Sequence, residues 1–205
     1  MNLKEDNTPR EYIEWTRIWR EGADKCDLPR VLLIGDSIVD DHGPAVQEEL
    51  RDKYYVDRIA TSRSFDQNYY WNLLDFFFSD TKIKYDLIIF NFGLHGFHIP
   101  TYDYGIFLDK LTKRLKRECP NLLYRNLTPM VNSTGEDWNV KQIKLVIDRN
   151  EVAEKVMAGN GVPILDMYTS MLGKDDIRLG DPYHFNDKGK ELQAKIIAEK
   201  VKELI

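Results

Sequence analysis

Short apolar runs alternate with longer amphipathic stretches along the chain. Four clear runs lie at residues 31–34, 87–90, 122–124 and 162–165, and a weaker one extends from 54 towards 59. Continuous apolar runs of this kind are typical of strands that are buried on both faces of a parallel sheet. We therefore expect about five parallel strands.

The stretches between these runs place apolar residues at helical spacing. We expect a helix that begins at Gly43 and Pro44, helices over 65–78, 104–117 and 140–157, and a last helix capped by Asn186. Strands that alternate with helices predict parallel βαβ units with right-handed crossovers. The expected fold class is α/β, a three-layer α/β/α sandwich.

The chain divides into two parts in this interpretation. Residues 1–30 are expected to be a helical extension packed on the domain, because Trp15, Ile18 and Trp19 share one face of a helix. Residues 31–205 are expected to be a single domain. Sheets of this type bind ligands beyond the carboxyl ends of their strands, so the residues directly after each strand are the candidates for chemistry.

Charge and cysteine content narrow the classes of function. The 205 residues include 29 basic and 34 acidic ones, and no cluster of Lys and Arg suits nucleic-acid binding. Cys26 and Cys119 lie too far apart for paired zinc ligands, and we expect no metal and no cofactor. No apolar stretch has the length of a membrane span, and the first residues are polar. We expect a cytoplasmic protein that binds no membrane; the sequence leaves its oligomeric state open.

Two groups of residues predict nucleophilic catalysis. Gly35, Asp36 and Ser37 follow the first expected strand, where a serine hydroxyl can face the crevice. Asp181 and His184 lie three residues apart in a loop before the last helix. Serine needs an adjacent base, histidine suits that role near neutral pH, and a carboxylate on its other nitrogen fixes the tautomer. We expect Ser37 as nucleophile, His184 as base and Asp181 as the acid that orients it.

A third group follows the expected strand at 87–90. Gly93 allows close backbone approach, and His95 would point a side-chain donor into the crevice. Together with the N–H of Ser37, His95 could stabilise an oxyanion. The alternative is a structural histidine.

The segments VLLIGDS at 31–37 and DPYH at 181–184 together resemble the first and last blocks of the SGNH, or GDSL-type, hydrolase superfamily. The resemblance extends from residue 31 to residue 205. It implies a flavodoxin-like α/β/α sandwich and esterase or lipase chemistry without a metal. It also implies for Ser37, Asp181 and His184 the roles given above.

Two blocks depart from the family pattern. The third block is usually Gly-x-Asn-Asp, and here His95 takes the place of the asparagine. A neutral imidazole with its N–H turned inward could serve the same purpose. The second block normally offers a glycine N–H, which residues 60–64 lack, so any of these five amides could complete the oxyanion hole. Arg63, Ser62 and Gly93 are expected to contact substrate, and the alternative for Arg63 is a structural role.

These features predict a serine esterase that removes a small acyl group, such as acetyl, from a carbohydrate or similar polar substrate through an acyl-enzyme. A lipase or thioesterase-type acylhydrolase is the alternative among enzymes. A non-catalytic binding domain of the same fold is the alternative outside them. A phosphate-binding domain is disfavoured, because GDSIVDDHG has no glycine-rich cradle and carries three acids.

Overall fold

The computed structural model describes residues 8–132 and 137–205. Within them lies a six-stranded sheet in the order β1-β3-β2-β4-β5-β6. The strands are β1 (Thr16–Trp19), β2 (Arg30–Gly35), β3 (Tyr55–Thr61), β4 (Leu87–Phe90), β5 (Leu122–Arg125) and β6 (Ile164–Leu165). Strands β2 to β6 are parallel and confirm the five expected strands. The chain leaves β2 for β3 on one side and later returns to β4 on the other, so β2 ends at the switch in strand order.

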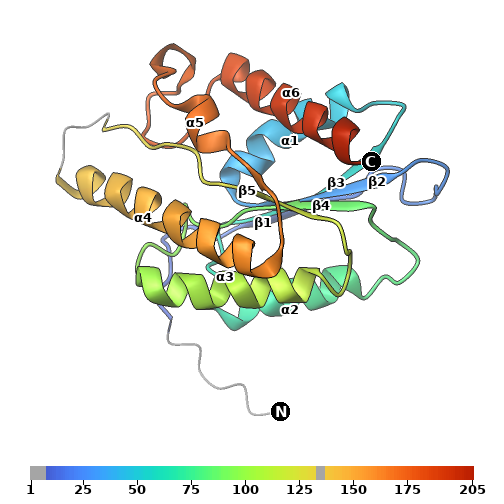
Figure 1. Ribbon diagram of the computed structural model, residues 1–205, viewed down its shortest axis with the longest axis horizontal. Helices are drawn as coiled ribbons and strands as arrows, with labels where there is room; N and C mark the ends of the chain where they lie inside the picture. The colour runs from blue at the N-terminus through green and yellow to red at the C-terminus, as the bar shows by residue number, and fades with distance from the viewer. Residues whose placement is uncertain (1–7, 133–136) are drawn as a thin grey trace.

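Helices cover both faces of the sheet. They are α1 (Ser37–Glu49), α2 (Asn68–Phe78), α3 (Thr101–Leu115), α4 (Asp137–Asn160), α5 (Met167–Met171), the 3-10 turn η1 (Asp175–Ile177) and α6 (Asp187–Leu204). Helices α2, α3 and α4 lie on one face, and α1, α5 and α6 lie on the other (Figure 1). This arrangement confirms the three-layer α/β/α sandwich.

Strand β2 shows how the sheet separates two cores. Leu32 and Ile34 belong to the apolar cluster under α2, α3 and α4, whereas Val31 and Leu33 belong to the cluster under α1 and α6. All four side chains are buried, which explains why the strand is an uninterrupted apolar run. The strand ends at Gly35 in the middle of the sheet, two residues before Ser37.

The helix expected in the N-terminal extension is wrong for residues 8–30; residues 1–7 lie outside the described part. Trp15, Ile18 and Trp19 have helical spacing, but residues 16–19 form strand β1, antiparallel to β3, with Thr16 opposite Thr61. Without β1, the outer N–H and C=O groups of β3 would lack partners, and pairing satisfies them. The division of the chain at residue 30 stays a prediction.

Helix α1 begins earlier than expected. It starts at Ser37 rather than at Gly43, and Pro44 lies inside it. Asp36 caps the helix, because its side chain accepts a hydrogen bond of 3.1 Å from the N–H of Ile38. Ser37 is therefore the first residue of a helix whose free N–H groups and positive dipole end lie beside its hydroxyl.

Candidate active site

Three side chains form a continuous chain of hydrogen bonds at the carboxyl end of β2. His184 Nε2 lies 2.9 Å from Ser37 Oγ, and His184 Nδ1 lies 2.8 Å from Asp181 Oδ2. Ser37 is half-buried, and the side chains of His184 and Asp181 remain 28% and 43% exposed. The three residues expected to cooperate therefore meet at one edge of the sheet, within reach of solvent.

The loop between η1 and α6 holds the histidine in place. Asp181 Oδ1 accepts hydrogen bonds from the backbone N–H groups of Tyr183 and His184, both at 2.8 Å. The N–H of Leu179 donates to the carbonyl of His184 at 3.0 Å. One turn further, Asn186 caps α6 as expected by accepting from the N–H of Gly189. A single short loop thus positions both the acid and the base.

The charge on Asp181 fixes the tautomer of His184. Burial acts to raise the pKa of Asp181, but the hydrogen bonds from His184 and Tyr183 outweigh it, and the pKa lies below its usual range. An ionised carboxylate only accepts hydrogen bonds, so Nδ1 of His184 carries a proton. In the neutral ring the lone pair of Nε2 then faces the hydroxyl of Ser37, as a general base requires.

Gly35 allows the strand to turn into the helix at this point. A Cβ at residue 35 would lie 2.2 Å from Asn91 Oδ1 and 2.4 Å from Val39 Cγ2. Both distances are shorter than any real contact, so no larger residue fits without moving its neighbours. Glycine at this position therefore brings the end of β2 against the end of β4.

The loop after β4, residues 91–99, carries His95 and is held by hydrogen bonds from helix α4. Arg149 on α4 is fully buried, and its guanidinium donates to the carbonyl oxygens of Gly93 (2.8 Å), His95 (3.2 Å), Gly96 (2.7 Å) and Ile99 (3.1 Å). Gly93 and Gly96 have φ angles of 145° and 63°, which favour glycine. One buried side chain therefore fixes the path of this loop.

Apolar contacts join the loop of His95 to the start of α1 and to the loop of His184. Leu94 shares a buried cluster with Ile38, the residue after Ser37, and Tyr183 and Phe97 pack against that cluster. The rings of Phe97 and Tyr183 lie 6.3 Å apart, and Tyr183 precedes His184. The loop of His95 and the loop of His184 are therefore neighbours, as expected for parts of one site.

The ring of His95 contacts the N-terminal segment. Its Nδ1 lies 2.7 Å from Glu11 Oε1, and the edge of Trp15 approaches the ring at 6.5 Å between centroids. Burial acts to lower the pKa of His95, but the hydrogen bond to Glu11 and the charge of Asp36 outweigh it and raise the pKa. His95 thus interacts with a carboxylate that the sequence did not point to.

In the second block, the loop after β3 is engaged with the same N-terminal segment. Ser62 donates its N–H to the carbonyl of Trp15 at 3.1 Å and accepts from the N–H of Trp15 at 2.8 Å. The guanidinium of Arg63 pairs with Glu14 and lies over the ring of Tyr69. These contacts support the structural alternative for Arg63 and leave Ser62 without a free amide.

Among the five amides that could complete an oxyanion hole, most are occupied. Ala60 and Thr61 belong to β3, and the N–H of Arg63 donates to Thr61 Oγ1. Within residues 8–132 and 137–205, the N–H of Ser64 donates to no acceptor. Ser64 is therefore the remaining candidate in the second block.

Three buried polar side chains lie near Ser37. Asp36, His42 and Arg125 are almost completely buried. Of the three, only Asp36 lies in a segment that resembles a block of the SGNH hydrolases. Burial, together with the charges of Arg125 and Arg58, holds the pKa of His42 well below its usual value. His42 is therefore neutral. Arg125 lies in a strand, where no sequence pattern marked it.

A hollow of about 210 Å³ adjoins the loop of His95. Its lining includes the polar or charged residues Arg10, Glu11, Ser62, Ser64, Gln67 and His98, together with Pro9 and Phe97. His98 Nε2 lies 2.7 Å from Asp66 Oδ2, and Asp66 also binds the hydroxyl of Ser64. The hollow therefore offers hydrogen-bonding groups next to the second and third blocks.

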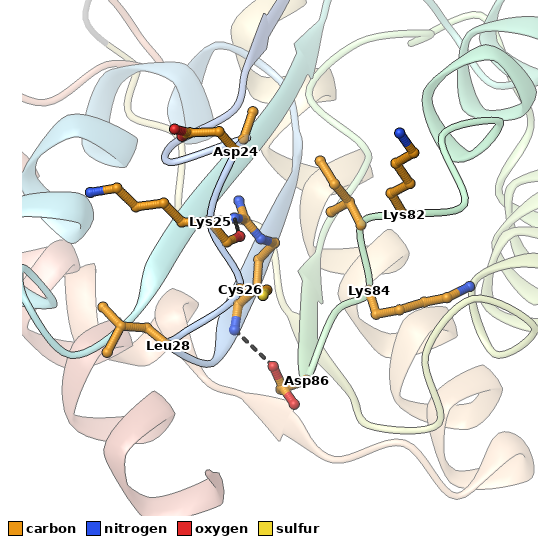
Figure 2. A pocket seen from close by; sticks show the side chains of 10 residues that line it. Asp24, Lys25, Cys26, Leu28, Lys82, Lys84 and Asp86 are labelled. Carbon is orange, nitrogen blue, oxygen red and sulfur yellow. Dashed lines mark hydrogen bonds between the residues drawn. The ribbon is translucent and has the colours of Figure 1, made fainter.

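A larger hollow of about 600 Å³ opens at the opposite end of the sheet, where β2 and β4 begin (Figure 2). The N–H of Arg30 donates to Asp86 there at 2.8 Å. The ammonium groups of Lys25, Lys82 and Lys84 point away from one another (Figure 2). No set of charged groups converges in this hollow among the residues drawn, and it lies far from Ser37 along the strands.

Sequence reasoning missed Glu11 and Arg149. Glu11 lies 84 positions from His95 and Arg149 lies 56 from Gly93, so no local motif links them. An arginine among the apolar positions of a helix that packs on the sheet was the available signal for Arg149.

Within the described residues, no helix is both long and apolar enough to cross a membrane.

No protein-family model and no curated protein matches the chain in sequence. Solved structures do match it. A lipase/acylhydrolase from Enterococcus faecalis has a TM-score of 0.68 at 17% identity, with 86% of this chain and 96% of the other covered. A member of the lipolytic G-D-S-L family from Veillonella parvula has a TM-score of 0.68 at 16% identity, with 85% and 99% covered.

A third match is a variant of an acetyl-xylooligosaccharide esterase from Geobacillus. It has a TM-score of 0.64 at 12% identity, with 84% of this chain and 94% of the other covered. The strand order of β2 to β6 is the flavodoxin-like order that the resemblance implied. The chain therefore has the fold of the SGNH and GDSL-type hydrolases.

Proposed function

We propose that this protein is a serine ester hydrolase with Ser37 as its nucleophile. The observation that carries the proposal is the hydrogen-bonded chain from Asp181 through His184 to Ser37, with distances of 2.8 and 2.9 Å. A serine hydroxyl is a weak nucleophile unless a positioned base takes its proton. A purely structural role for these side chains would not need this order of donors and acceptors.

The reaction follows from these positions. His184 Nε2 takes the proton of Ser37 as Oγ bonds to the ester carbonyl carbon, and the carbonyl oxygen becomes an oxyanion. The C–O bond to the alcohol then breaks, and the alcohol oxygen receives the proton from His184. Water attacks the acyl-enzyme with the same base, and the carboxylic acid leaves as Ser37 regains its proton.

Three groups are available to the oxyanion in this proposal. They are the N–H of Ser37 at the start of α1, the side chain of His95 and the N–H of Ser64. The helix dipole adds to the first of these. Asp181 stabilises the imidazolium that forms on His184 during each step.

For the substrate we propose a small acyl group on a polar, hydroxylated alcohol. The hollow beside the loop of His95 supports this choice, because its polar side chains can bind hydroxyl groups and its volume of about 210 Å³ is small for a long acyl chain. One matched structure is described as an acetyl-xylooligosaccharide esterase, which supports the same class.

Hydrolysis of p-nitrophenyl acetate, butyrate and octanoate tests the proposal. We expect the acetate to have the highest kcat/KM, and Ser37→Ala and His184→Ala to lower kcat by about 10⁴-fold or more. Ser79→Ala, at an exposed position of a helix end, is the matched control and should retain full activity. A preference for octanoate would favour a lipase. No turnover and no labelling by a fluorophosphonate would favour a binding domain.

A further inference from the structure

The N-terminal segment is attached to the candidate active site at several points. Trp15 exchanges two hydrogen bonds with Ser62, and Glu14 pairs with Arg63 and accepts from Gln67 Nε2 at 3.2 Å. These contacts lie directly before β1 and fix the chain on the second block. Glu11 therefore reaches the third block from an anchored segment.

The ring of His95 is held on one side and open on the other. Nδ1 meets Glu11 at 2.7 Å, and the edge of Trp15 lies against the ring. Within the described part of the chain, Nε2 has no hydrogen-bond partner, and it is not among the buried unpaired atoms. Nε2 is thus the nitrogen that solvent or a ligand can reach.

This arrangement decides which form of His95 can donate to an oxyanion. Because the carboxylate of Glu11 only accepts hydrogen bonds, Nδ1 must carry the proton in their contact. A neutral ring would then present a bare lone pair at Nε2, which repels an oxyanion. Only the imidazolium has an N–H at Nε2. The neutral donor expected from the sequence does not fit this contact.

We propose that Glu11 is a positioning residue that keeps His95 doubly protonated, with its Nε2–H available to the oxyanion. The inference rests on the proposed function, and it adds to that function a group from outside the four sequence blocks considered above. Glu11 acts through His95 and does not itself touch the substrate.

The charged groups around His95 agree with the proposal. Glu11 approaches from the N-terminal segment and Asp36 from the turn before α1, and both favour the cation. Trp15 is neutral. Arg149 on α4 contacts the backbone carbonyl of His95 rather than its ring. Together the two carboxylates raise the pKa of His95 in spite of burial, which acts in the opposite direction.

The pH profile of kcat/KM for p-nitrophenyl acetate tests the proposal. Activity then requires a neutral His184 and a charged His95, so the alkaline limb reports His95. In Glu11→Gln we expect the alkaline limb to move down by about one pH unit, which lowers activity there about 10-fold, with the acid limb unchanged. Tyr12→Ala, at a fully exposed neighbouring position, is the control and should keep the native profile.

A second variant separates this role from a structural one. In His95→Asn the amide donates at any pH, so adding Glu11→Gln should change kcat/KM less than twofold and leave no alkaline limb to move. An unchanged alkaline limb in Glu11→Gln would overturn the proposal. So would an equal loss from Glu11→Gln in the native and His95→Asn backgrounds, because that loss would not pass through His95.

A titration of the ring by NMR distinguishes the two proposals. In Ser37→Ala, which has no nucleophile, the pKa of His95 should fall by about one unit when Glu11→Gln is added. An inactive wild-type protein would refute the proposed hydrolase while leaving this coupling measurable. An active enzyme whose His95 titrates alike with and without Glu11 would refute the role of Glu11 alone.

Discussion

The guanidinium of Arg149 lies 2.7 Å from the carbonyl oxygen of Gly96, in a loop that is separated from it by 53 positions in sequence. The same side chain binds three further carbonyls of this loop. The contact links the interior of α4 with the residues around His95. It makes the position of a candidate oxyanion donor depend on a buried residue of another layer.

Replacement of Arg149 should therefore affect both stability and turnover. Arg149→Met leaves buried carbonyl groups without donors, and each such group costs about 1–3 kcal/mol. We expect a loss of about 3 kcal/mol in the free energy of unfolding by urea, and a decrease in kcat that exceeds the change in KM. Arg149→Lys should lose less stability and less activity than Arg149→Met, because its ammonium group still reaches some of the carbonyls. Arg51→Met, at an exposed position, should change neither quantity.

Two substitutions of His95 test whether its side chain acts as a hydrogen-bond donor. We expect His95→Asn to retain most of the activity at neutral pH, because an amide N–H can donate to the oxyanion. His95→Ala should lower kcat by about 10²-fold or more, since one donor is lost. Steady-state kinetics with p-nitrophenyl acetate would measure both. Equal rates for Ala and the wild type would remove His95 from the mechanism.

Gly35 should not tolerate a methyl group. The new Cβ of Gly35→Ala would collide with Asn91 and Val39, and such overpacking costs about 1–3 kcal/mol. The collision would also displace the start of α1, so kcat should fall together with the melting temperature. Gly159→Ala is the matched control, because a Cβ there meets no atom within 4 Å in helix α4. That substitution should stabilise the protein by up to about 1 kcal/mol.

His42 should make the protein sensitive to acid. Its pKa in the folded protein lies well below the value of about 6.5 in the unfolded chain, so the unfolded state binds the extra proton. The stability that neutral His42 contributes is complete above pH 6.5 and is lost as the pH falls towards the folded-state pKa. For a single proton this loss cannot exceed about 1.4 kcal/mol per pH unit.

Urea unfolding at several pH values measures that effect. In His42→Gln the decrease in stability between pH 6.5 and 5 should be smaller than in the wild type, even if the variant is less stable at pH 7. Parallel curves for the two proteins would show that His42 does not titrate on unfolding.

The sequence predicted those parts of the fold that follow from local pattern. The apolar runs of β2 and β4 predicted strands correctly, because both faces of these strands are buried. Asn186 correctly predicted the start of α6, because its side chain caps the helix. Ser37, Asp181 and His184 were candidates because their segments resemble the first and last blocks of the SGNH hydrolases. Their meeting, across 147 positions, is what the structure adds.

Other features depend on contacts that no local pattern encodes. Trp15, Ile18 and Trp19 have helical spacing. However, residues 16–19 pair with the otherwise open edge of β3, so Ile18 and Trp19 lie in a strand and Trp15 lies directly before it. Pro44 suggested the first turn of a helix, yet Asp36 caps α1 seven residues before Gly43. The partners of His95, Glu11 and Arg149, come from the N-terminal segment and from α4, so only the folded chain reveals them.

Strand β1 is joined to the sheet through β3 alone, and its Ile18 and Trp19 side chains are largely exposed. Apart from the contacts of Trp15 and Glu14 with the second block, little burial opposes the separation of β1 from β3, so this edge of the sheet can open while the layers on either side remain intact. Each such opening would withdraw Glu11 from His95 without disturbing Ser37 or His184. Warming should consequently lower kcat/KM for p-nitrophenyl acetate some degrees before the whole domain melts.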